Sequence, residues 1–408
     1  MLTRRRFLAT LSAAAALHQL APSASEAQSF INPLKKKVPA TPRPNFVYFG
    51  TDTQRGVSKG IYLSRFNPAT GQLSTPVLAA ATVRPSYLAI STPVAGHRRI
   101  YAANEANDSS AMLTSFLMDP ANGALHPINQ VTATGAGPCY VSLNAGGDAA
   151  FVANYAGSSI ASYRVLPNGS LSEPVERIDY KNPKFGKRGP AGARQDVPHP
   201  HSVHLSPDNR FLLVSDLGSD AITVFPVEPG AKLGTPVLFQ NDRAGCGPRH
   251  IAFHPNGRWV YSVNELDSTI DLFHWSETSS RTDPQGLLIN TGHFVKISAP
   301  GADSKNAAAE VAVSADGNFV YASNRGEDSL VVFGVAEDGK LTLVQRTGCG
   351  GKSPRQFALS PDSLGHWLVC GNQDSATVTV FRRDGVSGKL SGPVQTLPLD
   401  SVMFTLFA

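Results

Sequence analysis

A strand–turn–strand unit that recurs along the chain constrains the fold more than any other feature of the sequence. The unit at 248–265, PRHIAFHPNGRWVYSVNE, has related copies at 85–105, 138–155, 200–217, 308–325 and 354–373. Most copies begin with proline, turn at a Pro-Asp or Asn-Gly type sequence, and end their second apolar run in Asn or Asp. Short runs rich in Val, Ile, Tyr and Phe between such turns are typical of β-strands.

Two further strands are indicated after each copy. A third apolar run follows, as in AITVF at 221–225, and a fourth region is often marked by Gly-x-Leu, as at 339–341. Four strands in about 50 residues, repeated radially, describe a β-propeller. A degenerate seventh copy at 45–51 lacks its leading strand, and the chain ends in the strand-like VMFTLFA (402–408). We therefore predict an all-β, seven-bladed β-propeller closed by that C-terminal strand, because closure removes an exposed sheet edge. A ring of six or eight blades is the alternative, since degenerate copies are easily miscounted.

The first 28 residues have the organisation of an export signal. Three arginines in TRRRFL (3–8) precede a short apolar stretch, and a small-residue site follows at Ser25–Ala27. The stretch is too short to span a bilayer, and TRRRFL resembles the twin-arginine signal of proteins that are exported already folded. We expect a signal peptide at 1–28, a linker at 29–44 and the propeller at 45–408. The expected location is the periplasm or the outside, reached through the twin-arginine translocase; a general secretory signal or a membrane tether is the alternative.

Composition argues against nucleic acid as a partner. The formal net charge is +5, but without the first 28 residues 33 Lys and Arg face 30 Asp and Glu, a net charge of +3. A body so close to neutral lacks the basic surface that nucleic-acid binding requires. The four cysteines lack the spacing of a metal site, and an oxidising compartment would permit disulfides whose pairing the sequence leaves open. They are Cys139, Cys246, Cys349 and Cys370.

Comparing the copies separates residues that serve the blade from residues that serve the centre. The Asn or Asp that ends the second run recurs in all six full copies, so we interpret it as a backbone-capping residue. These residues are Asn104, Asn154, Asp216, Asn264, Asn324 and Asn372. Two neighbouring positions vary instead. The position after the leading Pro or Ala holds Ser86, Cys139, His201, Arg249, Ala309 and Arg355, and the position after the Asn or Asp holds Glu105, Tyr155, Leu217, Glu265, Arg325 and Gln373.

The variable residues are expected to surround one mouth of the central channel. Arg249 and Glu265 are symmetric about Gly257 in the turn, which predicts that they are cross-strand neighbours. His201, Arg249, Glu265 and Arg325 come from three adjacent blades. Arginines can bind a carboxylate or phosphate and stabilise an oxyanion, and Glu265 or His201 can take a proton from water. This set predicts a site for an anionic substrate with a reacting carbonyl; a purely structural ion-pair network is the alternative.

Residues 44–390 resemble the seven-bladed lactonase family that contains bacterial 6-phosphogluconolactonase and fungal carboxy-cis,cis-muconate cyclase. The resemblance rests on segments such as PHPHSVHLSPDNRFLLVSDLGSD, GPRHIAFHPNGRWVYSVNELDST and AEVAVSADGNFVYASNRGEDS in this order and spacing. In the cyclase branch a His, an Arg, a Glu and a second Arg have been proposed as the active site. The matching residues are His201, Arg249, Glu265 and Arg325. The resemblance implies a lactone beside an anionic group, without a metal or another cofactor.

These observations predict an exported lactone hydrolase that opens a sugar-type lactone by water attack. A second set of residues is expected to contact the substrate: Arg355, Gln373, Glu105 and His199. No metal is expected at His199-Pro200-His201, because proline interrupts the geometry and the sequence places no carboxylate beside the pair. The polar segment 179–199 is either a substrate-recognition lid or a surface loop. A carboxymuconate lactonising cycloisomerase and a non-catalytic periplasmic binding propeller are the alternatives, and we expect a monomer.

Overall fold

The computed structural model describes residues 45–408 except 94–95, 277–286, 303–304 and 363–364. The predicted signal peptide (1–28) and linker (29–44) lie outside the described residues. Within the described part the secondary structure is 29 strands and three short 3-10 helices. No helix there has the length and hydropathy needed to cross a membrane.

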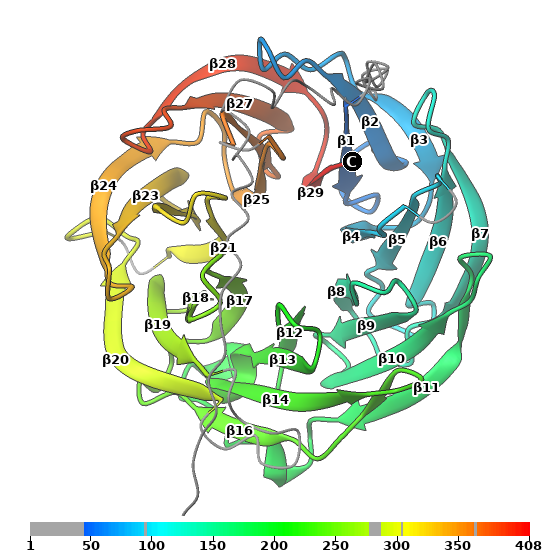
Figure 1. Ribbon diagram of the computed structural model, residues 1–408, viewed down its shortest axis with the longest axis vertical. Coiled ribbons are helices and arrows are strands. Elements are labelled where there is room, and N and C mark those ends of the chain that lie inside the picture. The colour runs from blue at the N-terminus through cyan, green and yellow to red at the C-terminus, as the bar shows by residue number, and fades with distance from the viewer. Residues whose placement is uncertain (1–44, 94–95, 277–286, 303–304, 363–364) are drawn as a thin grey trace, which may run out of the picture. The chain divides into compact units, whose positions relative to one another are not determined.

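The strands form seven sheets arranged around a central axis, which confirms the predicted seven-bladed propeller (Figure 1). The innermost strands are β4 (Pro85–Ile90), β8 (Pro138–Leu143), β12 (Pro200–Leu205), β17 (Pro248–Phe253), β21 (Ala307–Val313), β25 (Pro354–Leu359) and β29 (Val402–Phe407). The second strands are β1 (Asn45–Thr51), β5 (Arg99–Asn104), β9 (Ala149–Asn154), β13 (Phe211–Asp216), β18 (Trp259–Asn264), β22 (Phe319–Arg325) and β26 (Trp367–Asn372).

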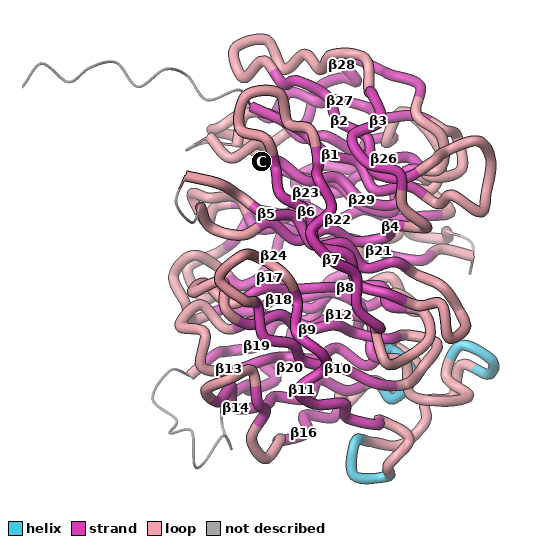
Figure 2. The backbone as a smooth tube through the Cα atoms, turned by 90° about the vertical axis from the view of Figure 1, so that its right-hand side faces the viewer, coloured by secondary structure: helices cyan, strands magenta, loops and turns pink. Residues whose placement is uncertain are grey.

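The outer half of each blade follows the same order. The third strands are β2 (Gly60–Phe66), β6 (Met112–Met118), β10 (Ser159–Val165), β14 (Ala221–Glu228), β19 (Thr269–Trp275), β23 (Ser329–Val335) and β27 (Thr377–Arg383). The outermost strands are β3 (Val77–Ala81), β7 (Leu125–Thr132), β11 (Leu171–Asp179), β15 (Lys232–Leu233) with β16 (Val237–Gln240), β20 (Leu288–Lys296), β24 (Leu341–Gly348) and β28 (Leu390–Pro398). The helices η1 (Pro183–Phe185), η2 (Gly192–Arg194) and η3 (Leu217–Ser219) lie on one face (Figure 2).

The C-terminal strand closes the ring, as predicted. β29 pairs antiparallel with β1, and Val47 lies opposite Phe407 in the register. The blade that lacks a leading strand in its own segment therefore receives one from the other end of the chain. The pairing gives β1 a partner on both sides, β29 and β2, so β1 is not an exposed edge.

A recurring tyrosine explains the Gly-x-Leu marker of the sequence. The buried second-strand tyrosines donate their hydroxyls to a glycine carbonyl of the next blade, at 2.7–3.0 Å. The pairs are Tyr48 with Gly123, Tyr101 with Gly169, Tyr261 with Gly339 and Tyr321 with Gly388. Each glycine has a positive φ, between 70° and 89°, which side chains rarely adopt. The leucine two residues later is buried in all four cases, so the motif supplies both a turn and a core residue between blades.

Candidate active site

A β-bulge near the start of most inner strands directs the variable residues toward the channel. In β17, Pro248 pairs with Asn264 but His250 pairs with Val263, so Arg249 is an extra, unpaired residue. The same shift occurs in β4, β8, β12, β21 and β25. Bulges commonly redirect a side chain near a functional site. Arg249 and Glu265 therefore contact each other without being a directly opposed pair, which corrects the simple symmetric register that the sequence predicted.

The second variable position is held by a repeated backbone hydrogen bond. The amide of the residue after the recurrent Asn donates to the carbonyl just before the leading Pro. Examples are Glu105 to Arg84, Tyr155 to Gly137, Glu265 to Gly247 and Gln373 to Ser353, at 2.8–3.0 Å. The recurrent Asn or Asp is buried in all six copies. The backbone thus repeats around the ring while the side chains at these positions differ.

These side chains line a cavity of about 310 Å³. Six of the seven blades contribute to its wall, together with the connection between β11 and β12. The lining residues are Glu105, Cys139, Tyr155, Arg194, His201, Glu265, Arg325 and Arg355. A cavity of this size suits a ligand no larger than a monosaccharide derivative.

Glu265 is the centre of an ion-pair cluster in the wall. Its Oε2 accepts from Arg249 Nε at 2.9 Å and lies 2.9 Å from Arg325 Nη2, and its Oε1 accepts from Arg194. Burial alone would raise the pKa of Glu265, but Arg325, Arg249 and Arg194 outweigh it and hold the pKa well below its usual range. Such a carboxylate stays ionised and is a weak proton acceptor. Its charge orients the arginines around it.

Arg249 lies behind the cavity, although the sequence placed it among the groups that bind substrate. Its guanidinium is buried, donates to Glu265 and to the carbonyl of Ala309, and lies 3.2 Å from His250 Nε2. Burial and the neighbouring Arg325 lower the pKa of Arg249 to about 10, which still leaves it protonated at neutral pH. Its position makes Arg249 a support for Glu265.

His201 presents an imidazole without a protein hydrogen-bond partner in the described part of the chain. The residue is 6% exposed, and its Nδ1 is buried and unpaired. Its ring packs edge-on against Tyr155 and His250, with centroids 5.5 and 5.2 Å away. Burial, reinforced by Arg249, lowers the pKa of His201 well below 6.5. The ring is therefore neutral at neutral pH and keeps a lone pair that can accept a hydrogen bond from a ligand or water.

Arg355 is the arginine of the wall with the weakest attachment to protein. Its Nη2 lies 3.8 Å from Glu105 Oε2, beyond hydrogen-bond distance, and its side chain is 17% exposed. Glu105 is also paired with Arg84, which in turn contacts Asp52 at 3.1 Å. The cavity wall therefore holds three guanidiniums and two carboxylates, a net positive charge that favours an anionic ligand. They are Arg194, Arg325 and Arg355 with Glu105 and Glu265.

Five of the eight sequence-predicted residues line the cavity, and three do not. Arg249 lies behind Glu265, and Gln373 is outside the wall, with its backbone N–H donating to the carbonyl of Ser353. His199 is also outside, because its ring stacks on Tyr155 with centroids 4.3 Å apart and its Nδ1 lies 3.0 Å from the Tyr155 carbonyl. It supports the wall from behind.

The wall also contains three residues that the sequence reasoning did not select. Cys139 and Tyr155 occupy the variable positions of their blade, but both are uncharged, and the prediction rested on charged and imidazole side chains. Burial raises the pKa of Cys139 to about 12, so its thiol stays protonated, and it lies 3.2 Å from the carbonyl of His201. Arg194 belongs to a connection with no repeated counterpart, which a comparison of blades cannot detect. All four cysteines are buried and free.

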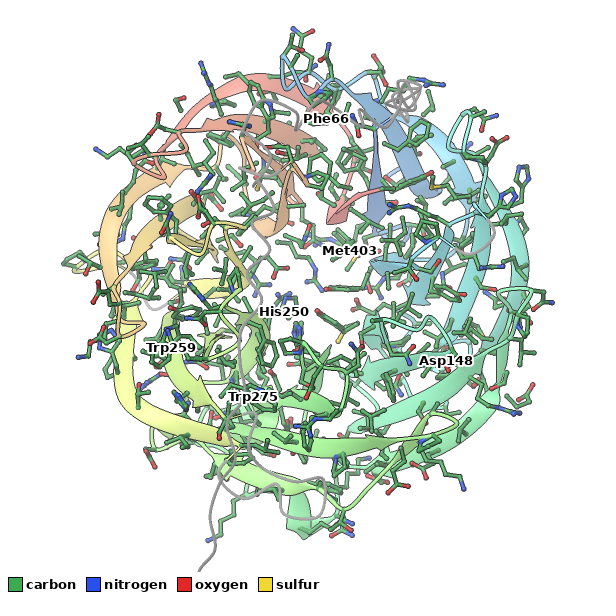
Figure 3. The ribbon with its side chains drawn as sticks, viewed as in Figure 1. Phe66, Asp148, His250, Trp259, Trp275 and Met403 are labelled. Carbon is green, nitrogen blue, oxygen red and sulfur yellow. The ribbon has the colours of Figure 1, made fainter. Side chains whose placement is uncertain are left out.

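A second polar group lies deeper in the channel. His250, at the inner edge of the ring (Figure 3), has its Nδ1 3.2 Å from the carboxylate of Glu310. Burial raises the pKa of Glu310 to about 7, and burial together with Arg249 lowers that of His250 well below 6.5. Below pH 7 a protonated Glu310 can therefore donate to a neutral His250. Within the described residues, no group of three or more His, Cys, Asp or Glu side chains is arranged to hold a metal ion.

Glu310 gives the fold a predictable pH dependence. Its pKa is higher in the folded state than in the unfolded chain, so its contribution to stability is present at pH 4 and lost as the pH rises through about 7. Glu310→Gln keeps a donor for His250 without a charge. We expect the variant to match the wild-type melting temperature at pH 5 and to exceed it by about 2–5 °C at pH 8. Calorimetry at both pH values, with the exposed Glu337→Gln as control, measures this; a lower melting temperature at pH 8 would contradict it.

Comparison with known proteins identifies the family. The family described as "Lactonase, 7-bladed beta-propeller" matches residues 46–407. The 6-phosphogluconolactonase of Bacillus subtilis is 30% identical over 351 residues, which cover 84% of this chain and 93% of that protein. The 6-phosphogluconolactonase of Formosa agariphila is 29% identical over 368 residues, 88% of this chain and 96% of that protein.

A solved structure agrees with these sequence relatives. The periplasmic gluconolactonase of Pseudomonas aeruginosa is 32% identical, with a TM-score of 0.79 that covers 89% of this chain and 98% of that one. The match of the family extends over the whole described propeller. The chain therefore belongs to the seven-bladed β-propeller lactonase family of enzymes.

Proposed function

We propose that this protein hydrolyses a sugar-type lactone that carries an anionic group. The observation that carries the proposal is the neutral imidazole of His201, with its unpaired Nδ1, in a cavity whose wall also contains Arg325 and Arg355. Lactone hydrolysis requires a proton acceptor for water and positive charge for the developing oxyanion, and these groups can supply both. The relatives named 6-phosphogluconolactonase and gluconolactonase support the same class of substrate.

Each residue of the site has a separate role in the proposed reaction. Water attacks the lactone carbonyl carbon while His201 takes one of the water protons. Arg355, whose Nη2 lies 3.8 Å from the Glu105 carboxylate, stabilises the oxyanion of the tetrahedral intermediate. The bond between the carbonyl carbon and the ring oxygen then breaks, and the ring oxygen receives the proton from His201. The product is an open-chain hydroxy acid. Glu265 holds Arg325 and Arg194 in place throughout, and no step requires it to change protonation.

Arg355→Gln tests the oxyanion role. Loss of one preorganised donor to an oxyanion typically lowers kcat by about 10²–10³-fold. We expect this loss for phosphorylated and unphosphorylated lactones alike, with KM changed less than about threefold, because the interaction develops in the transition state. Steady-state kinetics on 6-phosphoglucono-δ-lactone and glucono-δ-lactone measure both parameters. A rise in KM with an unchanged kcat would instead assign Arg355 to ground-state binding.

Product analysis tests the reaction itself. Incubation of the wild type with the two gluconolactones in ¹⁸O-labelled water should yield sugar acids that carry one label, measured above the spontaneous rate by mass spectrometry. Conversion of a carboxymuconate to its lactone without incorporated water would favour the cycloisomerase. Saturable binding of lactones without turnover would favour a binding protein.

We also propose export through the twin-arginine route. The sequence TRRRFL at 3–8 and the periplasmic location named for the Pseudomonas aeruginosa relative support this proposal. The signal itself lies outside the described residues. Cell fractionation of the full chain, beside a variant with Arg4 and Arg5 replaced by lysine, tests it; equal export of both would argue for another route.

A further inference from the structure

The connection between β11 and β12 supplies the cavity with a residue that the blades do not provide. It covers residues 180–199, and Arg194 is the last residue of η2 within it. The side chain of Arg194 is 48% exposed, whereas that of its partner Glu265 is 4% exposed. Arg194 therefore lies at the solvent side of the cavity, above a buried carboxylate.

Glu265 already has two other cationic partners. Arg249 and Arg325 each lie 2.9 Å from its Oε2, so the charge of the carboxylate is balanced without Arg194. The Glu265 carboxylate engages Nη2 of Arg194, and the Tyr155 hydroxyl also interacts with this guanidinium. A guanidinium has five N–H donors in a planar fork that fits a phosphate or carboxylate. Arg194 thus retains positive charge and donors for an anion that enters the cavity.

A buried glutamine holds this segment against the connection between β13 and β14, which in turn contacts the residue before β17. Gln195 is 1% exposed, and its Nε2 donates to the carbonyl of Leu217 at 2.8 Å and to Asp220 Oδ1 at 2.7 Å. The same oxygen of Asp220 accepts from the amide of Gly247 at 2.8 Å, and the Gly247 carbonyl accepts from the amide of Glu265. One carboxylate therefore fixes Arg194 and Glu265 relative to each other.

We propose that Arg194 is a specificity-determining residue that recognises an anionic substituent remote from the lactone carbonyl, and that Gln195 is its positioning residue. The inference rests on the proposed lactonase function. The chemical class of the substituent is a phosphate or carboxylate at the end of the sugar chain opposite the lactone. Binding joins this group to the outer donors of Arg194, while the reacting carbonyl lies deeper, near His201 and Arg355.

The test compares lactones that differ by one phosphate. For Arg194→Gln, we expect KM for 6-phosphoglucono-δ-lactone to rise about 10–100-fold, the range for a lost charge-assisted hydrogen bond. The kcat for this substrate and both parameters for glucono-δ-lactone should change less than about threefold. The KM of Arg194→Lys for the phosphorylated lactone should lie between those of the wild type and Arg194→Gln. Lysine keeps the positive charge but lacks the planar set of donors of a guanidinium. Arg177→Gln is the matched control, since Arg177 is similarly exposed and pairs with Asp179 on β11. This variant should have the wild-type kcat and KM for both lactones.

A binding experiment separates failure of this inference from failure of the proposed function. Titration calorimetry with 6-phosphogluconate and gluconate needs no turnover, and the two ligands share their carboxylate. Arg194→Gln should weaken binding of the phosphorylated acid by about 10–100-fold and leave gluconate unchanged. An equal effect on both ligands, or on neither, overturns the role of Arg194 whether or not the wild type hydrolyses lactones.

Gln195→Ala tests positioning rather than contact. Loss of its bonds to Leu217 and Asp220 should raise the KM for the phosphorylated lactone about 3–10-fold, less than loss of Arg194 because the guanidinium is still present, and leave the KM for the unphosphorylated lactone unchanged. A merely structural glutamine would lower the melting temperature without changing the ratio of kcat/KM between the two lactones. That result would remove Gln195 from the proposal.

Discussion

His201→Asn is expected to lower kcat for lactone hydrolysis by about 10²–10⁴-fold, the usual contribution of a positioned general base. Asparagine keeps a polar side chain of similar reach but cannot take up a proton. The surrounding wall should persist, because no described protein group hydrogen-bonds to the imidazole. KM should therefore change little. Stopped-flow measurement of acid release, corrected for spontaneous hydrolysis, gives both parameters.

The pH dependence of kcat/KM for the wild type provides a second test of His201 as the general base. Burial and Arg249 lower the pKa of His201, so the basic form that accepts a proton persists below pH 6.5. The acid limb of kcat/KM should consequently fall below pH 6.5 and be absent in His201→Asn. The exposed His126→Asn is the control and should match the wild type. A variant of His201 that keeps more than about a third of kcat would assign the base to another group.

Glu265→Gln is expected to cost about 3–5 kcal/mol of unfolding free energy. The substitution removes the shared partner of Arg194, Arg249 and Arg325, and breaking a buried ion pair leaves uncompensated charge in the interior. Turnover should also fall by at least about tenfold, since the arginines lose the carboxylate that orients them. Urea denaturation and kinetics on the same preparation measure the two effects. Equal stability and turnover in variant and wild type would show that the cluster is dispensable.

A double variant separates the electrostatic cause from general disruption. Glu265→Gln with Arg249→Met removes the most deeply buried of the three guanidiniums together with its partner. Replacing both members of a buried pair costs much less than removing one. The double variant should therefore recover part of the stability lost by Glu265→Gln. Further destabilisation, equal to the sum of the single effects, would indicate that the pair is not coupled.

Short sequence patterns predicted the fold, because strand and turn preferences depend on residues that are close together in the chain. Strand composition, turn chemistry and the Asn or Asp after the second apolar run recur every 48–62 residues in six copies, so each copy independently indicates the same hairpin. The missing leading strand of the first copy also predicted that β29 completes the blade. The bulges could not be predicted in the same way. In a bulge, two residues of one strand lie opposite a single residue of its partner. It can be recognised only when the register of both strands is known.

The candidate site was predicted by residue type and only partly by position. Glu265, Arg249 and Arg325 meet in one cluster. The guanidinium of Arg249, however, donates to Glu265 and to the Ala309 carbonyl and lies behind the cavity. Arg194 has no counterpart in the other copies, so comparison of the copies contained no signal for it. Its position depends on Gln195 and Asp220, which meet across 25 residues of chain.

The sequence by itself predicted seven blades, the order of strands and the two positions per repeated copy at which side chains vary. It could do so because hydrophobic alternation and turn preference act within a few residues. Only the tertiary structure decided which arginines are free for a ligand and which residue can accept a proton. The availability of Arg355, the ionisation of Glu265 and the neutrality of His201 all depend on burial and on charges brought from other blades. These electrostatic effects arise only when segments distant in the chain bury the groups together.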